Sequence, residues 1–589
     1  MSNHEPNLSA DLADAAESSR PHPRSRLISV ACASVVILTT VVSRPVSSEE
    51  VFLTIGGGPE PASNQVSIEK CVELFASVLE ETCPAAERMT FFADGDIAKR
   101  DVQFLDPNDD PSVAMRWVAR LIGDESELSM RYRDSELGNV TGPARKAYLK
   151  QTFFELADRL TAGDRLVIYV AAHGGPPEDD YSSYGYDDDF DADDYYSSYA
   201  SAPSNVFNTT IALWNNESLS AEELSLWLDD FDPEVEVVMI MAQCFSGGFA
   251  RTLFHSADPK RAWSPARRCG FFSQRHTLPS TGCTPLVDET EYEDYSTHLL
   301  QAIRGADAEG TTIHADIDGD GQVSMREAHA HAMLTADSMD VPLTTSDMLL
   351  RKFSKIGDIP EASDDETSGE SPGFFRSLFG GGKADDKTTP PRGSANDRSQ
   401  SLHRGMTIDQ IAGRADSIHG HVMDELSSEL NVDADTTVAK LTTRSRRLRK
   451  AAADAETRWA QQQTVREGIV QEIYGAAVRE YPELESNFHP MIVSICQDHD
   501  AAERFVHFIQ TYPGTQAFET ADEKTKRLET KSEKADNRSA KFRRLVATVE
   551  SSMLLQNLDL EASPAIANRV REVLEMEGKP LSRCEASAE

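Results

Sequence analysis

Cysteine is scarce in this sequence. Eight cysteines among 589 residues are too few for a scaffold built from disulfide bonds. One or two bridges could still form, with Cys269 and Cys283 as one candidate pair, and buried free thiols are an equally good interpretation. Each cysteine therefore has to be interpreted by what surrounds it.

Basic residues are also in short supply. The chain has 58 Lys and Arg against 98 Asp and Glu, a formal net charge of −40 at pH 7. This excess argues against binding to nucleic-acid phosphates as the main function and disfavours anionic membrane surfaces. Basic peptides are the partners that such a surface would attract. A hydrophobic content of 39% suffices for a core, although the acidic and Ser-rich stretches should not all fold.

Long hydrophobic runs are almost absent, with one exception near the N-terminus. Residues 27–42, LISVACASVVILTTVV, carry no charge and follow a basic cluster. The run is slightly short for a spanning helix, which needs roughly 17–25 residues. Val46, Ser47 and Ser48 have the small-residue character of a signal-peptidase site. We expect export to the periplasm or outside the cell, or anchoring in a membrane by 27–42, with cleavage and retention both open.

From residue 49 the pattern is that of an α/β domain. Expected strands 51–55, 89–93, 166–172 and 235–242 alternate with expected helices 64–81, 145–160 and 220–230. Nearly continuous apolar strands predict a parallel-rich sheet flanked by helices, and 235–242 is the last strand expected. Ser220 and Glu223 occupy capping-box positions at the start of the third helix.

The composition divides the chain into four parts. These are an N-terminal tail (1–48), the α/β domain (49–358), a flexible linker rich in Ser, Gly, Asp and Pro (359–404), and a helical C-terminal region (405–589). Within the α/β domain, the acidic Tyr/Ser-rich stretch 178–202 is expected to be a mobile loop. The apolar stripe of the C-terminal region is too interrupted to indicate a coiled coil, and its helices are a candidate surface for protein partners. This stripe consists of Val438, Leu441, Leu448, Ala455, Ile469 and Ile473.

Two expected strands end in reactive residues. The sequence VIYVAAHGG ends with His173, Gly174 and Gly175, and VVMIMAQCFSGG contains Cys244. Parallel strands bring such residues to one edge of the sheet, where the histidine can activate the thiol. The adjacent glycines would let a peptide approach, and the amides of Gly174 and Cys244 could donate to an oxyanion. A lone histidine at a strand end is more often structural, and a lone buried cysteine is usually inert. Their conjunction, 71 residues apart (244 − 173), favours catalysis.

This conjunction resembles the caspase–hemoglobinase superfamily of cysteine peptidases, which includes legumains, caspases, metacaspases and gingipains. The resemblance covers about residues 50–355 and is greatest to legumain-like bacterial members. It implies a caspase-like sheet, Cys244 as the nucleophile and His173 as the proton donor to the leaving amine. It also implies that a peptide lies across the strand ends with its P1 side chain in a deep pocket.

The sequence departs from that superfamily near the nucleophile. Gln243 precedes Cys244 where metacaspases carry an acidic residue, and the QACRG string of caspases is absent. The P1 preferences of those relatives therefore do not transfer. The acidic stretch after His173 suggests, as a separate hypothesis, that basic substrates are attracted.

A second motif lies at 316–327, where DIDGDGQVSMRE fits the twelve-residue calcium loop of an EF-hand. A turn glycine lies at position 6 and a helix is expected from 324 to 336, but no helix is expected directly upstream. The motif predicts a Ca²⁺ site, and a degenerate acidic turn is the alternative. The expected ligand residues are Asp316, Asp318, Asp320, Gln322, Ser324 and Glu327.

The sequence therefore predicts a cysteine endopeptidase of caspase–legumain type, with or without dependence on calcium. Transpeptidation or cleavage of its own linker are close variants, since legumain relatives include such activities. An alternative from another class is a catalytically silent calcium-binding scaffold whose helices recruit other proteins.

Overall fold

The computed structural model describes residues 48–97, 99–177, 207–259, 261–283, 294–353, 405–486 and 489–583. Three segments that the sequence singled out, 27–42, 178–202 and 359–404, lie outside these residues. Within the described ranges, no helix combines the length and the apolarity needed to cross a bilayer.

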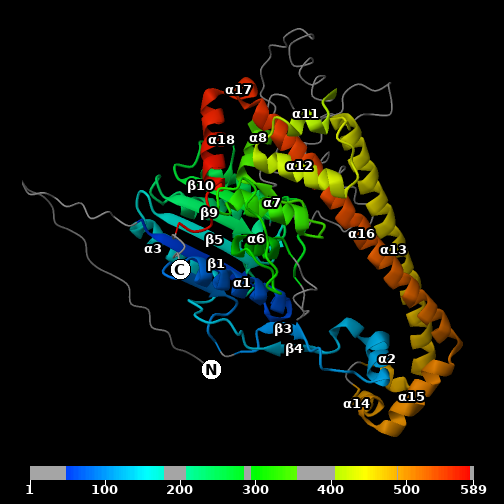
Figure 1. Cartoon of the computed structure of the whole chain (residues 1–589). Helices are drawn as coiled ribbons and strands as arrows, with labels where there is room; N and C mark the ends of the chain where they lie inside the picture. Colours follow the sequence, from blue (N-terminus) through cyan, green and yellow to red (C-terminus); the bar gives the residue numbers. More distant parts are fainter. Residues whose placement is uncertain are drawn as a thin grey trace, which may run out of the picture. The chain divides into compact units, whose positions relative to one another are not determined.

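A six-stranded sheet forms the centre of the fold (Figure 1). Its strand order is β11-β10-β9-β5-β1-β2, and all neighbours pair in parallel except β10 and β11. All residues of β5 and β9 are buried, which explains their uninterrupted apolar sequences. The expected mostly parallel α/β sheet is confirmed. The strands are β1 (Glu50–Gly57), β2 (Glu87–Phe92), β5 (Arg165–Ala172), β9 (Glu236–Met241), β10 (Arg267–Phe272) and β11 (Leu343–Thr344).

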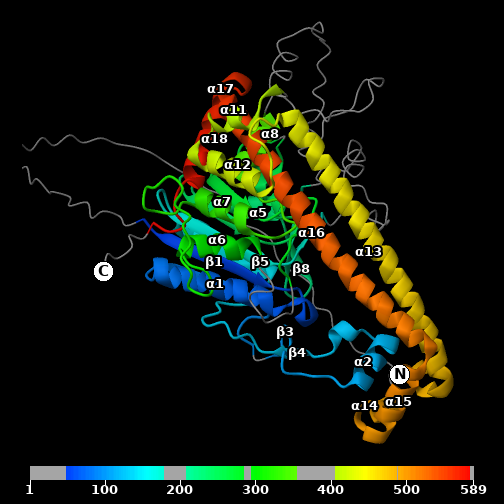
Figure 2. The same ribbon diagram turned by 45° about the vertical axis from the view of Figure 1, so that its right-hand side comes forward.

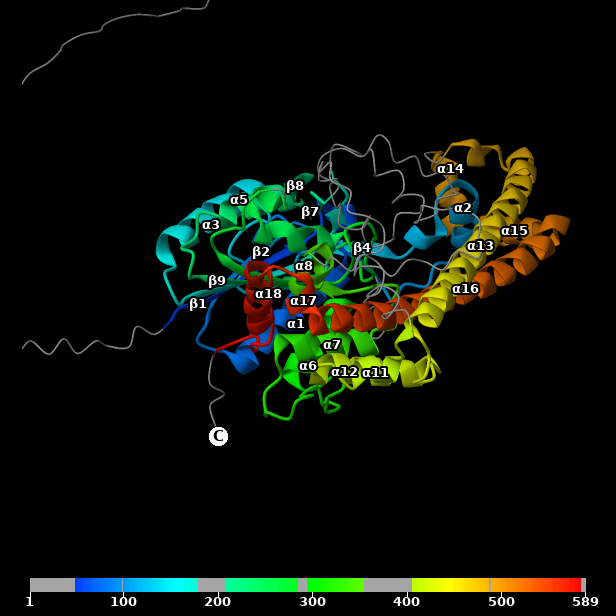
Figure 3. The same cartoon turned by 90° about the horizontal axis from the view of Figure 1, so that it is seen from above.

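Helices flank the sheet on both faces (Figure 3). A first group of helices, α1, α6 and α7, packs together on one face of the sheet. A second group, α3 and α5, forms contacts on the opposite face. Ser220 and Glu223 form the expected capping box at the start of α5. The first group is α1 (Val66–Thr82), α6 (Tyr295–Arg304) and α7 (Met325–Thr335); the second is α3 (Lys146–Arg159) and α5 (Ala221–Leu228).

The prediction that 235–242 is the last strand was wrong, because β10 follows it and pairs with β9. The sequence of β10, RRCGFF, contains two arginines and a glycine and therefore does not form the apolar run expected of a buried strand. Arg268 is fully buried and donates to the Asp229 carboxylate at 2.7 Å and to the Thr252 carbonyl at 2.6 Å. A buried arginine whose hydrogen bonds are supplied by distant parts of the fold gives no apolar signal in a sequence.

Two small sheets lie beside the central one. β3 and β4 form an antiparallel pair, and β6, β7 and β8 form a three-stranded sheet. Neither was expected from the sequence, because their strands have at most four residues and little periodicity. The elements are β3 (Val102–Leu105), α2 (Val113–Ile122), β4 (Met130–Arg133), β6 (Gly174–Gly175), β7 (Thr210–Leu213) and β8 (Glu217–Ser220).

The C-terminal region is helical, as expected. Its two longest helices, α13 with 43 residues and α16 with 44, lie side by side (Figure 2). They run antiparallel, because the start of α13 shares an apolar cluster with the end of α16, and the end of α13 shares another with the start of α16. The helices are α8 (Thr345–Phe353), α11 (Ile408–Ala412), α12 (Ser417–Glu429), α13 (Val438–Glu480), α14 (Pro490–Gln497), α15 (His499–Thr511), α16 (Pro513–Gln556), α17 (Leu558–Glu561) and α18 (Pro564–Glu577).

The interrupted apolar stripe predicted in this region lies on α13, on the side that packs against α16. Val438, Leu441, Ala455 and Ile473 are buried, while Leu448 and Ile469 are partly buried. The C-terminal helices also pack on the α/β part of the chain, since α18 contacts β10 and α16 contacts α8. Residues from Ser48 onward therefore form one compact unit.

Candidate active site

The pairing of β5 with β9 brings the two predicted catalytic residues to the same level. The last residues paired in these parallel strands are Val170 and Met241. His173 and Cys244 each follow by three positions (170 + 3 and 241 + 3), so they occupy matching places just past the carboxyl edge of the sheet. The Ala242 amide donates to the Val170 carbonyl at 3.0 Å, which continues the register toward the pair.

Gly174 brings the backbone after β5 against the backbone of the nucleophile. A Cβ atom at Gly174 would lie 2.1 Å from the Cys244 carbonyl oxygen and 2.9 Å from Cγ of Gln243. A Cβ at Gly247 would lie 2.8 Å from the Gln274 carbonyl oxygen. The space that these glycines leave free of a side chain is therefore occupied by other backbone segments of the protein.

The thiol of Cys244 is partly buried and bonded to the backbone of Ser280. The Ser280 amide donates to Sγ at 3.2 Å, and Sγ–H faces the Ser280 carbonyl at 3.6 Å. Burial raises the pKa of Cys244 above its ordinary value of 9.0, and the Asp340 carboxylate acts in the same direction. Hydrogen bonds from the amides of Ser280, Cys244 and Gly174 oppose this rise in pKa. At neutral pH Cys244 is therefore a neutral thiol beside amides that favour its thiolate.

His173 is held by residues that precede helix α1. Its Nε2 lies 2.9 Å from Oε1 of Gln65. Because an amide oxygen only accepts, the ring donates from Nε2 in this contact. Burial lowers the pKa of His173 below its ordinary 6.5, and a hydrogen bond to the Ser63 carbonyl opposes this. His173 is therefore a neutral imidazole with one basic nitrogen.

In the described part of the chain, no hydrogen bond joins His173 to Cys244, and each has other partners. Catalytic hydrogen bonds are often long before substrate binds, so this arrangement is compatible with a reacting pair. Gln65, Ser63 and Ser280 were not predicted, since each lies in a loop or at a helix cap and belongs to no motif.

The loop that carries Ser63 and Gln65 is tied down at several points. The Gly58 amide donates to Oδ1 of Asn64 at 3.1 Å, and Nδ2 of Asn64 donates to the Asp101 carbonyl at 2.9 Å. Asn64 is fully buried, and Gln65 forms a backbone bridge with Gln103 at the start of β3. The β1–α1 loop is thus fixed between the sheet edge and the β3–β4 pair.

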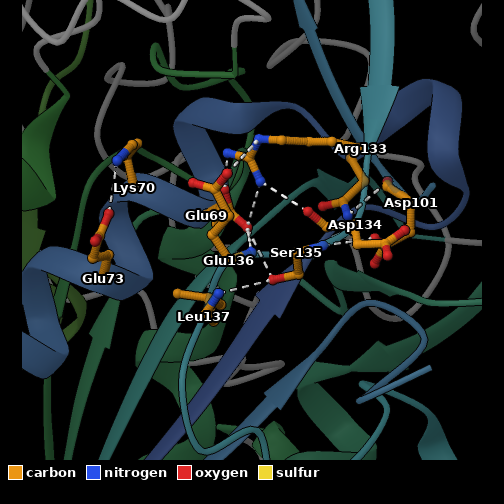
Figure 4. A network of polar contacts seen from close by, with 10 residues as sticks. Glu69, Lys70, Glu73, Asp101, Arg133, Asp134, Ser135, Glu136 and Leu137 are labelled. Atoms are coloured by element: carbon orange, nitrogen blue, oxygen red, sulfur yellow. Dashed lines mark hydrogen bonds and ion pairs between the residues drawn. The ribbon is translucent and has the colours of Figure 1, made fainter. Parts of the chain in front are cut away.

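A buried carboxylate anchors the first turn of α1 to the segment after β4 (Figure 4). Glu69 is 2% exposed and accepts from both terminal nitrogens of the Arg133 guanidinium. It also accepts from the Ser135 hydroxyl at 2.9 Å and the Glu136 amide at 2.7 Å. A buried carboxylate with this many donors is a rigid anchor, and it fixes the helix whose cap residue, Gln65, holds His173.

The predicted calcium loop brings three of its carboxylates together. Asp316, Asp318 and Asp320 are exposed, and their ligand oxygens lie within 4.8 Å of one another. Asp316 accepts from the amides of Gly319 and Gly321 at 2.8 and 3.0 Å, and Gly321 has a φ of +91°, the left-handed turn that position 6 requires. Hard oxygen donors in this arrangement fit a divalent cation such as Ca²⁺.

The other predicted ligand residues have different surroundings. Glu327 is 1% exposed and accepts from the amides of Ile317 and Ser324, both at 2.8 Å. Ser324 forms a capping box with it at the start of α7, and the Gln322 amide donates to Asp320 at 2.8 Å, which leaves the Gln322 carbonyl for a cation. The exiting helix expected at 324–336 is α7, and directly upstream there is no helix because α6 ends at Arg304.

Cys269 and Cys283, suggested as one candidate disulfide pair, are both free. Cys269 lies in the interior of β10 and is fully buried, where burial strongly raises its pKa. Cys83 is disulfide-bonded.

Comparison with known proteins adds little. No protein-family model and no curated protein matches the chain. Among solved structures, a structural genomics target from Geobacter sulfurreducens is similar over 50% of this chain and 92% of its own, with 12% sequence identity and a TM-score of 0.28. A likeness at this level carries no argument about fold or function.

Proposed function

We propose that the protein is a cysteine endopeptidase that hydrolyses peptide bonds through Cys244 and His173. The observation that carries this proposal is the strand register, which gives the two residues matching positions past the carboxyl ends of neighbouring parallel strands. The resemblance to the caspase–hemoglobinase superfamily supports it, because those enzymes have His-Gly after one strand and the nucleophilic cysteine after the next. The neutral imidazole, whose pKa burial holds below 6.5, supports it further.

The first half of the reaction breaks the peptide bond. Sγ of Cys244 attacks the scissile carbonyl carbon while His173 takes the thiol proton. The carbonyl oxygen becomes an oxyanion, and the amides of Gly174 and Cys244 donate to it. Collapse of this intermediate expels the amine, which receives the proton from His173, and leaves a thioester on Cys244.

The second half releases the other product. A water molecule attacks the thioester carbonyl while His173 takes its proton. Collapse of the second oxyanion breaks the C–S bond, returns the proton to sulfur and frees the carboxylic acid. If the amine of a second peptide attacks in place of water, the same steps give transpeptidation.

The test is cleavage of a diverse peptide mixture by the full-length chain, with a Cys244→Ala variant beside it. We expect cleavage by the wild type alone, and the cut sites will identify the P1 residue. Given the net charge of −40, we expect cuts to concentrate at basic P1 residues. Cleavage that persists in the variant, or is absent from the folded wild type, would contradict the proposal and favour the silent scaffold.

The pH dependence of kcat/KM follows from the two neutral groups. The reactive free enzyme has neutral His173 and protonated Cys244, so activity is lost when His173 gains a proton or Cys244 loses one. The pKa of His173 lies below 6.5 and that of Cys244 above 9.0. We therefore expect an acid limb below pH 6.5, an alkaline limb above pH 9 and a plateau between them. An acid limb centred above pH 7 would contradict this.

A Gln65→Glu variant sharpens the pH experiment. A carboxylate at this position would accept the same hydrogen bond from Nε2 and would favour the imidazolium. The acid limb should therefore move to higher pH, while the alkaline limb should stay in place. Movement of neither limb would mean that Gln65 does not control His173.

We propose further that the loop 316–327 binds Ca²⁺ through Asp316, Asp318 and Asp320, with Glu327 and the Gln322 carbonyl completing the oxygen set. Asp320→Asn removes one anionic ligand and should weaken Ca²⁺ binding about tenfold or more, as measured by titration calorimetry. Glu309→Gln, a change at an exposed position on the preceding turn, is the matched control and should bind as the wild type does. Equal affinities in all three proteins, or no binding, would indicate a degenerate acidic turn.

A further inference from the structure

A buried arginine on the long helix α16 organises the turn that follows α7. Arg544 is fully buried, and all five of its N–H groups have acceptors. Nε donates to the Asp340 carbonyl at 2.8 Å, and Nη1 donates to the carbonyls of Met333 and Ala336 at 3.0 and 2.7 Å. Nη2 donates to the carbonyl and the hydroxyl of Ser338, both at 3.0 Å. Arg544 therefore contacts four residues of the segment 333–340, to which Asn537 and Arg543 of the same helix also donate, at the carbonyls of Asp337 and Met339.

This turn presents the carboxylate of Asp340 to a second segment, Thr277–Gly282. Asp340 is fully buried, and its Oδ1 accepts from the amide and the hydroxyl of Thr281 at 3.0 and 3.4 Å. Gln274 holds the same segment two residues earlier, where its Nε2 donates to the Pro279 carbonyl at 3.1 Å. Ser280, the residue between these two anchors, is therefore fixed on both sides.

Ser280 is the residue that contacts the nucleophile. Its amide donates to Sγ of Cys244 at 3.2 Å, and its hydroxyl donates to Ser273 at 3.0 Å. Two residues before Ser280, the carbonyl of Leu278 accepts a hydrogen bond from the Phe245 amide at 3.0 Å. Phe245 directly follows Cys244. An unbroken series of contacts thus runs from Arg544 through Asp340 and Thr281 to the thiol.

We propose that Asp340, itself held by Arg544, is a positioning residue for Cys244, and that the C-terminal helical region thereby forms part of the catalytic apparatus. The proposal rests on the proposed function for its consequence in catalysis, but its effect on the thiol can be measured separately. Asp340 keeps the Ser280 amide directed at Sγ. Burial is the main cause of the raised pKa of the Cys244 thiol, and the negative charge of Asp340 acts in the same direction.

The charged and titratable groups around this site give the effect a recognisable pH dependence. Burial raises the pKa of Asp340 to about 6, while the Thr281 amide and the Arg544 guanidinium oppose the rise. Asp340 acts on the pKa of Cys244, and Cys244 acts on that of Cys283. His173 lies at the matching position just past β5, and Arg544 stays charged with a pKa of about 10. Asp340 is thus a group near Cys244 that changes charge around pH 6.

The experiment compares the reactivity of Cys244 in the full-length wild type and in Asp340→Asn, which keeps the shape of the side chain and removes its charge. The probe is 2,2′-dithiodipyridine, with modification at Cys244 quantified by mass spectrometry. At pH 8 the variant should react about three- to tenfold faster, because a nearby negative charge no longer opposes the thiolate. At pH 5, where wild-type Asp340 is largely protonated, the two rates should converge. A ratio that is the same at both pH values, including a ratio of one, would overturn the proposal.

Peptide cleavage gives the second readout. Asp340→Asn should lower kcat about tenfold with little change in KM, because the neutral amide oxygen is a weaker acceptor for Thr281 and holds Ser280 less firmly beside the thiol, while the substrate still binds. Arg544→Met should lower kcat at least as much, whereas Arg527→Met, at an exposed position on the same helix, should leave it unchanged. If Arg544→Met does not fold, the Asp340→Asn results decide alone. Normal cleavage by Asp340→Asn would refute the positioning role and leave the proposed function intact. Absence of cleavage by the wild type would refute the proposed function, but it would leave the pH-dependent effect of Asp340 on the thiol standing.

Discussion

Replacing His173 by alanine is expected to lower kcat for peptide cleavage about a thousandfold, within the range usual for loss of a general acid–base. The variant has no group to take the proton from Cys244 or to protonate the leaving amine. KM should change little, because His173 acts on the proton and not on binding. The measurement is steady-state kinetics on the best peptide from the cleavage mixture, with the melting temperature recorded for each protein.

His507→Ala is the matched control for this variant. His507 is exposed on α15, so its loss should change neither kcat nor KM. Residual cleavage by His173→Ala should no longer show the acid limb that His173 causes in the wild type. If His173→Ala keeps more than about a tenth of the wild-type kcat, a role in general acid–base catalysis is contradicted.

Replacing Gly174 by alanine is the second change with a large expected effect. The new methyl group would lie 2.1 Å from the Cys244 carbonyl oxygen, far inside van der Waals contact, so the backbone of one strand end has to move away from the other. Overpacking of this kind costs about 1–3 kcal/mol of folding stability. The same movement would separate the two amides proposed to bind the oxyanion, and loss of one such donor lowers kcat about 10²–10³-fold.

The control for this variant is Gly138→Ala. Gly138 has no heavy atom within 4 Å of an added Cβ, and its φ is not in the left-handed region. Its replacement should leave kcat unchanged and the melting temperature equal or slightly raised. Wild-type kcat in Gly174→Ala would mean that the contact between the two strand ends has no part in catalysis.

The central strands could be predicted because they are buried on both faces. β1, β5 and β9 consist of apolar runs, and each lies within two residues of its expected bounds. β10 was not predicted because the hydrogen bonds of Arg268 go to partners distant in sequence, Asp229 and Thr252. Burial of a polar residue becomes visible only when the fold supplies its hydrogen bonds.

The same difference separates the predicted site residues from the missed ones. His173 and Cys244 follow strands that are recognisable from their apolar sequences, and glycines lie beside both residues where the backbones make close contacts. Gln65 and Asp340 act from a helix cap and a turn, at 108 residues from His173 and 96 from Cys244 along the chain (173 − 65 and 340 − 244). Only the tertiary fold places such residues, so no local pattern could have indicated them.

The contribution of Arg544 was equally hidden. In sequence it is one basic residue in the charged stretch KFRRLV of a long helix, where a solvated position is the ordinary expectation. Its burial follows from the packing of α16 against the turn after α7. The sequence, in which a linker separates these two segments, does not predict that they pack together.

The measurement that tests the central claim most directly is covalent capture of the nucleophile by peptidyl acyloxymethyl ketones with varied P1 residues. These reagents need an activated thiol and a bound peptide, so they separate a working cysteine from free thiols such as Cys496. We predict labelling at Cys244, identified by mass spectrometry, that is abolished in Cys244→Ala and strongly slowed in His173→Ala. Labelling confined to other cysteines, or equal labelling with and without His173, would contradict the assignment of Cys244 and His173 as the catalytic pair.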